Sequence, residues 1–115
     1  MHEMSIAQNI LDIVREHVTP EQEQNVRTIK IKLGEFSGVV KESLEFCFSS
    51  LVNDTPLREA TLEIEDIPIK ALCLVCNKES RLEYGVFFCP LCGSNAVKLI
   101  SGKELQIETI EISDR

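Results

Sequence analysis

The chain has 115 residues, enough for one core of ordinary size or for a small core joined to a metal-held lobe. Apolar residues make up 43% of the sequence, which argues against a disordered chain. The formal net charge of −7 disfavours nucleic-acid binding, because that binding gains most of its affinity from Lys and Arg at phosphates. An acidic surface suits basic protein partners or metal cations better.

The sequence indicates no targeting or membrane segment. The N-terminus lacks the basic stretch and apolar run of a signal peptide, and no apolar run approaches the ~18 residues that a membrane span needs. We therefore expect a cytoplasmic protein. Thiols stay reduced in that compartment, so paired cysteines favour metal ligation over disulfides.

The first half of the chain predicts a helix followed by a strand. Apolar residues recur at helical spacing over residues 5–18, and the residue before Pro20 is pushed out of the α region, which ends the helix. The acidic, Gln-rich stretch 20–25 is expected to be a loop. Residues 26–33 alternate between apolar and polar side chains, which predicts a half-buried strand. Gly34 and Gly38 then bracket a turn.

The second half predicts a helix at about 41–53 and strands at 60–67 and 104–112, on either side of a turn-rich cysteine segment. The alternation in the last strand slips by one residue near Glu108-Thr109, which predicts a β-bulge. We expect the two flanking strands to pair with each other and the cysteine segment to be an insertion.

These elements predict an α+β fold, in which a small mixed sheet with two helices carries an inserted four-cysteine domain that resembles a zinc ribbon. The predicted domain boundaries assign residues 1–68 and 103–115 to the α/β domain and residues 69–102 to the inserted domain.

Four cysteines in two Cys-x-x-Cys pairs are the strongest motif. Cys73 and Cys76 are separated by twelve residues from Cys89 and Cys92. Soft thiolates in two such pairs select tetrahedral Zn²⁺, and the absence of His from residues 69–102 leaves a closed set of four sulfurs, typical of structural zinc. A redox dithiol is the alternative, although such motifs use a single pair at a helix start.

Each pair must bend so that both sulfurs reach one ion. The residue after the second cysteine often needs a left-handed backbone, which Asn77 and Gly93 can supply. The fifth cysteine, Cys47, lies on the apolar face of the second predicted helix, and we expect it to pack in the core.

The N-terminus offers a second set of metal ligands. The amine of Met1, the backbone nitrogen of His2 and its imidazole can chelate one ion, and three nitrogens in a plane suit Ni²⁺ or Cu²⁺. Glu3 could complete the set. A terminus without a function is the competing interpretation of these three residues. For His17, an interaction with the dipole at the end of the first helix is the expected role.

Together these motifs resemble the HypA/HybF family of nickel metallochaperones for hydrogenase maturation. The resemblance covers the whole chain and depends on the opening Met-His-Glu, Gly34-Glu35-Phe36-Ser37-Gly38-Val39, Ser43-Leu44-Glu45-Phe46-Cys47-Phe48, the two cysteine pairs and Leu105-Gln106-Ile107. It implies a non-enzymatic protein with structural Zn²⁺ on the four cysteines. It also implies that Ni²⁺ is carried by His2 with Met1 and Glu3.

The resemblance further implies a role and partners. The implied role is delivery of nickel to the [NiFe]-hydrogenase large subunit with the GTPase HypB, and in some organisms service to urease maturation. Family members occur as monomers and as homodimers. Many also have an acid near the start of the second helix, where this chain has Val40 and Lys41; Glu42 is the nearest acid and is a further nickel candidate.

Two other function classes are weighed against this one. A zinc-ribbon module for protein or nucleic-acid interaction, without nickel, fits the cysteines but not the acidity or the lack of clustered Arg and aromatic residues. A zinc enzyme fails because four cysteine ligands leave no open position for water or substrate.

Overall fold

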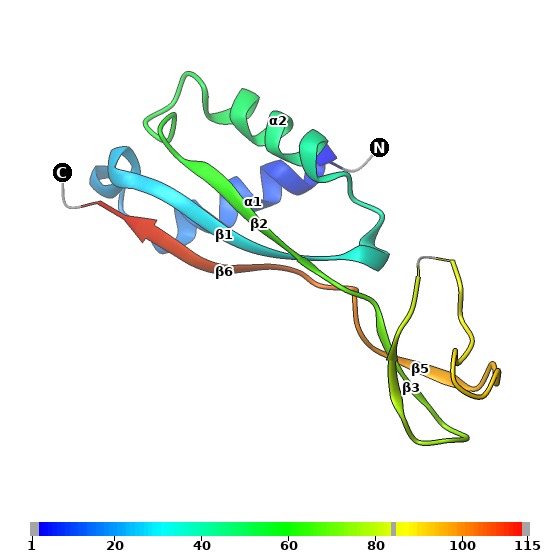
Figure 1. The fold of residues 1–115 in the computed structure, drawn as a ribbon. Coiled ribbons are helices and arrows are strands. Elements are labelled where there is room, and N and C mark those ends of the chain that lie inside the picture. Colours follow the sequence, from blue (N-terminus) through cyan, green and yellow to red (C-terminus); the bar gives the residue numbers. More distant parts are fainter. Residues whose placement is uncertain (1–2, 84, 114–115) are drawn as a thin grey trace. The chain divides into compact units, whose positions relative to one another are not determined.

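The computed structural model describes residues 3–83 and 85–113 of the chain (Figure 1). In chain order the elements are α1 (Glu3–His17), η1 (Pro20–Asn25), β1 (Val26–Gly34), η2 (Glu35–Ser37), α2 (Lys41–Val52), β2 (Thr61–Ile67), β3 (Lys70–Cys73), β4 (Glu79–Arg81), β5 (Val97–Ser101) and β6 (Leu105–Ile112). The strands form two three-stranded sheets, ordered β2-β1-β6 and β4-β3-β5. This confirms the predicted α+β class.

The chain divides into two compact units. The first contains the described residues up to Ile31, Val39–Glu65 and the described residues from Gln106 onward. The second contains Lys32–Gly38 and Asp66–Leu105. The segment Lys32–Gly38 thus belongs to the cysteine-bearing unit, although the sequence places it well before the cysteines.

In the first unit, two amphipathic helices lie along one face of the β2-β1-β6 sheet and pack against each other (Figure 1). Their buried side chains recur every three or four residues, as the helical period requires. They are Ala7, Ile10, Leu11 and Val14 in α1, and Leu44, Phe48 and Val52 in α2. The expected loop at 20–25 is instead the short helix η1. Thr19 precedes this helix, and its backbone N–H donates to the side-chain oxygen of Gln22 at 2.9 Å.

β1 lies between the two outer strands, which corrects the expectation that β2 and β6 pair directly. The most buried strand, β1, takes the central position, and the cross-strand charges fit this order. The outward side chain of Lys30 forms an ion pair with Glu111 of β6 at 3.4 Å. Glu111, and then Glu63 of β2 and Glu108 of β6, raise the pKa of the Lys30 ammonium. Pairing β2 with β6 would set these carboxylates against each other, which cross-strand neighbours avoid.

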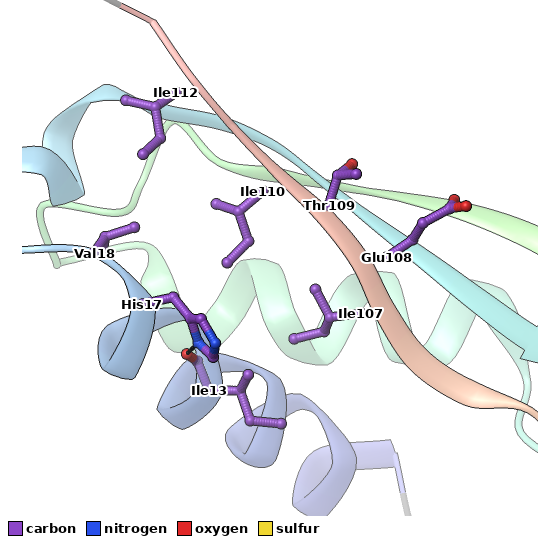
Figure 2. Close-up of a pocket in the computed structure, with 8 residues that line it drawn as sticks. All are labelled: Ile13, His17, Val18, Ile107, Glu108, Thr109, Ile110 and Ile112. Atoms are coloured by element: carbon purple, nitrogen blue, oxygen red, sulfur yellow. Dashed lines mark hydrogen bonds between the residues drawn. The ribbon is translucent and has the colours of Figure 1, made fainter.

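The predicted phase change in β6 is visible in its side-chain directions. Ile107 and Ile110 point toward α1, whereas Glu108 and Thr109, which are consecutive, both point away (Figure 2). A regular strand would alternate at every residue. A β-bulge at this place stays a prediction.

The second unit is an antiparallel sheet over a small core. β3 pairs with β4 and β5 so that Ala71 lies opposite Ser80 on one side and Leu99 on the other. The core contains Ile69, Ala71 and Leu82, with Phe36, Val97 and Leu99 packed against it. The sheet was not expected, because these short strands carry little periodicity of their own.

Candidate metal centre

The four predicted cysteines form one cluster at the end of β3 and in the loop before β5. Their sulfur atoms all lie within 4.8 Å of one another. The Cys73 and Cys92 sulfurs are 3.5 Å apart, and those of Cys76 and Cys89 are 3.7 Å apart. A tetrahedral ion with metal–sulfur bonds of ~2.3 Å requires edges of roughly 3.8 Å. The cluster therefore fits one tetrahedral ion.

Each Cys-x-x-Cys pair is built as the same tight turn. In the first, the N–H of Asn77 donates to the carbonyl of Cys73 at 2.9 Å, and the Cys73 N–H donates to the Lys78 carbonyl at 3.0 Å. In the second, the N–H of Gly93 donates to the carbonyl of Cys89 at 2.8 Å. Asn77 and Gly93 have φ of 60° and 79°, so the predicted left-handed residues are confirmed.

Backbone N–H groups favour ionisation of the first cysteine of each pair. The N–H of Cys76 donates to the Cys73 sulfur at 3.4 Å, and this contact lowers the pKa of the Cys73 thiol to about 6. The N–H of Cys92 likewise lowers the pKa of the Cys89 thiol. Both sulfurs belong to buried residues, where two donated hydrogen bonds replace water around a thiolate.

The second cysteine of each pair is shifted the other way. The N–H of Lys78 favours the ionised form of Cys76, but burial and the neighbouring thiols outweigh it and raise the pKa. The N–H of Ser94 acts in the same sense on Cys92, where the thiol of Cys73, followed by burial, raises the pKa to about 11. The sulfurs thus compete for negative charge, and a divalent cation at their centre would relieve that competition.

This donor set fits a closed structural site. Four thiolates around one ion leave no position for water, and soft sulfur ligands in tetrahedral array favour Zn²⁺ over ions that prefer oxygen. Cys73 and Cys89 are buried while Cys92 is exposed, so the cluster lies at the surface of its unit. Cys73 itself belongs to strand β3, where it lies opposite Val97 of β5.

The segment that starts at Gly34 supports this unit and was not recognised as part of it. The Gly34 N–H donates to the Glu104 carbonyl and the Phe36 N–H to the Gly102 carbonyl, each at 2.7 Å. Phe36 also meets Phe87 edge to face, with ring centroids 5.4 Å apart. The Gly-Glu-Phe-Ser-Gly motif was visible in the sequence, but its docking place, far along the chain, was not.

The N-terminal nickel candidates Met1 and His2 lie outside the described residues. Glu3 opens α1, and its carboxylate accepts the backbone N–H of Val40 at 3.2 Å. Val40 is the residue before α2, so Glu3 lies at the start of the second helix. Glu42 is exposed in the first turn of that helix.

His17 and Cys47, which were not expected to bind metal, take no part in the cysteine cluster. His17 is exposed in the last turn of α1, where Nδ1 donates to the Ile13 carbonyl at 2.8 Å, in keeping with a residue that interacts with the helix end. Cys47 is only partly buried, so the expectation that it packs in the core is wrong. Among the described residues, no helix combines the length and apolarity that crossing a bilayer requires.

Comparisons with known proteins agree on one family. Residues 1–112 match the family model described as "Hydrogenase/urease nickel incorporation, metallochaperone, hypA". Hydrogenase maturation factor HypA from Desulfatibacillum aliphaticivorans is 40% identical over 116 residues, covering 99% of this chain and 88% of the relative. The protein of that name from Prosthecochloris aestuarii is 39% identical over 112 residues, covering 97% and 99%.

Solved structures show the same fold. A solution structure of the nickel metallochaperone HypA from Helicobacter pylori has a TM-score of 0.65 at 22% identity, covering 97% of each chain. A second HypA solution structure has a TM-score of 0.71 at 21% identity, covering 100% of this chain and 98% of the other. With its cysteine cluster and its match over residues 1–112, the chain belongs to the HypA family of hydrogenase-maturation, nickel-incorporation metallochaperones, which are not enzymes.

Proposed function

We propose that this chain binds Ni²⁺ at its N-terminus and delivers it to the large subunit of a [NiFe]-hydrogenase in the cytoplasm. The ligands are the Met1 amine, the His2 backbone and imidazole nitrogens, and Glu3. The observation that carries the proposal is the family match, which spans the N-terminal residues. Ligands at a chain terminus suit a carrier, because they can be exchanged one at a time for those of an acceptor.

The position of Glu3 supports its inclusion in the site. Its carboxylate accepts the Val40 N–H at 3.2 Å, and Glu3 directly follows the proposed ligands Met1 and His2 in the sequence. Glu42, in the first turn of α2, is the second carboxylate at this end of the helix. We retain it as an additional ligand candidate.

The four cysteines are proposed to hold Zn²⁺ permanently, separate from the nickel cargo. Their closed tetrahedral arrangement supports this division, because a transported ion needs a site that opens. Residues 1–68 and 103–115 then form the nickel-binding domain and residues 69–102 the zinc-binding domain.

The chain's acidity supports protein partners, a HypB-type GTPase and the hydrogenase subunit, over nucleic acid. Urease maturation is a second process to which the same Ni²⁺ could be delivered under this proposal.

Calorimetric titration of zinc-loaded protein with Ni²⁺ tests the nickel site. A chain with its native N-terminus is expected to show one site that an N-terminal extension removes, because the extension converts the amine into an amide. We expect His2→Ala to weaken binding by at least about tenfold, since the variant lacks a ligand. His17→Ala is the matched control and is expected to bind as the unmodified chain does.

Unchanged nickel affinity in both the extended chain and His2→Ala would overturn the proposal. Glu3→Gln and Glu42→Gln, titrated in parallel, assign the carboxylate: only the variant that lacks a true ligand loses affinity. Loss in neither variant restricts the site to nitrogen ligands.

A further inference from the structure

A groove in the first unit is lined by none of the candidate metal ligands. It has a volume of about 360 Å³ and runs between the C-terminal half of α1 and strand β6 (Figure 2). Most of its lining is aliphatic. The lining residues are Ile13, His17, Val18, Ile107, Glu108, Thr109, Ile110 and Ile112.

Strand β6 is an edge of its sheet, which makes the groove accessible to an added strand. In the described part of the chain, its only strand partner is β1, so one side of its backbone has no strand beside it. Ile107, Ile110 and Ile112 reach from β6 toward α1 (Figure 2). The side chains of Ile13 and Ile112 are each 39% exposed. Native proteins usually cover or charge such an edge, because it can pair with another chain.

The charge around the groove selects the kind of chain that can bind there. Helix α1 and strand β6 together carry Glu3, Asp12, Glu16, Glu108 and Glu111 against Arg15, and Lys30 of the neighbouring strand β1 pairs with Glu111. The whole first unit has fourteen acids and six bases, a formal charge of −8. A second copy would bring the same carboxylates to the same edge, where like charges opposite each other are destabilising. A basic segment meets complementary charge instead.

We propose that β6 and α1 form a docking groove for an extended, basic segment of a partner protein, which adds a strand to β6. Alternate aliphatic side chains of that segment enter the groove over Ile13 and Ile110, while its Lys and Arg side chains point to the opposite face, the side on which Glu108 lies. The His17 side chain forms one end of the groove. Because its Nδ1 proton is held by the Ile13 carbonyl, the Nε2 atom of the neutral ring is an acceptor.

The proposal requires neither nickel nor the N-terminal ligands, so it can fail or succeed independently of the proposed function. The probe is a synthetic peptide of alternating isoleucine and lysine, compared with one in which glutamate replaces every lysine. Binding is followed by NMR on the zinc-loaded full chain. We expect the lysine peptide to bind saturably, to shift amide signals in β6 and in the last turns of α1, and to slow hydrogen exchange in β6. The glutamate peptide is expected not to bind.

Matched variants locate the site. Ile13→Gln removes an exposed aliphatic side chain from the groove and is expected to weaken peptide binding about tenfold. Phe46→Gln removes a more exposed apolar side chain, 72% accessible on α2, and is expected to change affinity by less than about twofold. Glu108→Lys is expected to weaken binding more than Glu59→Lys, which makes the same change of charge outside the groove.

Three results would overturn the proposal. The first is equal loss in Ile13→Gln and Phe46→Gln, and the second is amide shifts confined to other elements. The third is protection of β6 that grows with protein concentration without peptide and vanishes in Ile13→Gln, since a second copy of the chain would then occupy the groove.

Discussion

Glu35 shows how one side chain can join two distant parts of the cysteine-bearing unit. One carboxylate oxygen accepts the backbone N–H of Ile69 and the other pairs with Arg81, each at 3.1 Å. Ile69 is fully buried, whereas the Arg81 side chain is 67% exposed. A hydrogen bond to a buried donor matters more than an exposed ion pair, because only the buried donor has no water to replace its partner.

Glu35→Ala is therefore expected to lower the free energy of unfolding by about 1–2 kcal/mol, since the buried N–H of Ile69 loses its acceptor. Glu35→Gln keeps an acceptor oxygen and is expected to lose less. Arg81→Ala is expected to cost less than about 1 kcal/mol. Urea denaturation of the three zinc-loaded variants measures the differences. An equal loss in Glu35→Ala and Arg81→Ala would instead assign the stabilisation to the ion pair.

At the scale of elements, the basic strand β1 lies between the acidic strands β2 and β6. The chain continues from the end of β1 through η2, which belongs to the second unit. β1 places Lys30 beside the carboxylates of β2 and β6, so the cross-strand charges fit the strand order. The end of β1 and the start of η2 are held against residues 102–104 by two backbone hydrogen bonds, from Gly34 and Phe36. A Cβ atom on Gly34 would overlap the Gly102 carbonyl, so this close approach requires glycine.

Gly34→Ala is expected to destabilise the chain by about 3 kcal/mol, because the new methyl group must push two backbone segments apart. Gly38→Ala is the matched control. Gly38 has φ of 74° with open space around its Cβ position, so its substitution is expected to cost only about 1 kcal/mol of backbone strain. Thermal unfolding of both variants provides the comparison, and a similar melting temperature for the two would show that the segment is not tightly docked.

At the scale of the whole molecule, the two units differ in how much apolar core they contain. The first buries two helix faces against a sheet. The second has a cluster of three buried residues with three half-buried neighbours. A core this small rarely folds without a metal or a disulfide, so we assign much of the second unit's stability to its cysteine-bound ion.

Removing that ion is expected to unfold the second unit while the first stays folded. Hydrogen exchange after chelation should accelerate in β3, β4 and β5, whereas the amides of α1 and α2 keep their protection. Atomic emission should detect about one zinc ion per untreated chain. Cys73→Ser is expected to reproduce the effect of chelation, and Cys47→Ser to leave both zinc content and exchange unchanged. Uniform acceleration across both units would contradict the assignment.

Much of the fold could be predicted because its signals are local. Helical periodicity located α1 and α2, and strict alternation located β1, since each period reflects which side chains a single element buries. The strands β3, β4 and β5 carry no such pattern, because they depend on their partner strands rather than on an alternating apolar face. The prediction that Cys47 packs in the core was wrong, because a residue at the border of an apolar face is buried only if a neighbouring element covers it.

The residues alone indicated the four cysteines as candidate metal ligands, the N-terminal nickel candidates and the acidity that favours protein partners. Spacing and ligand chemistry are properties of residues close in the chain. The three-dimensional structure was needed to show that β1 separates β2 from β6, that Gly34 and Glu35 belong with the cysteines, and that an apolar groove lies along β6. These features depend on contacts between residues far apart in sequence. Cross-strand charge and close packing decide which of these contacts form once the helices and strands are in place.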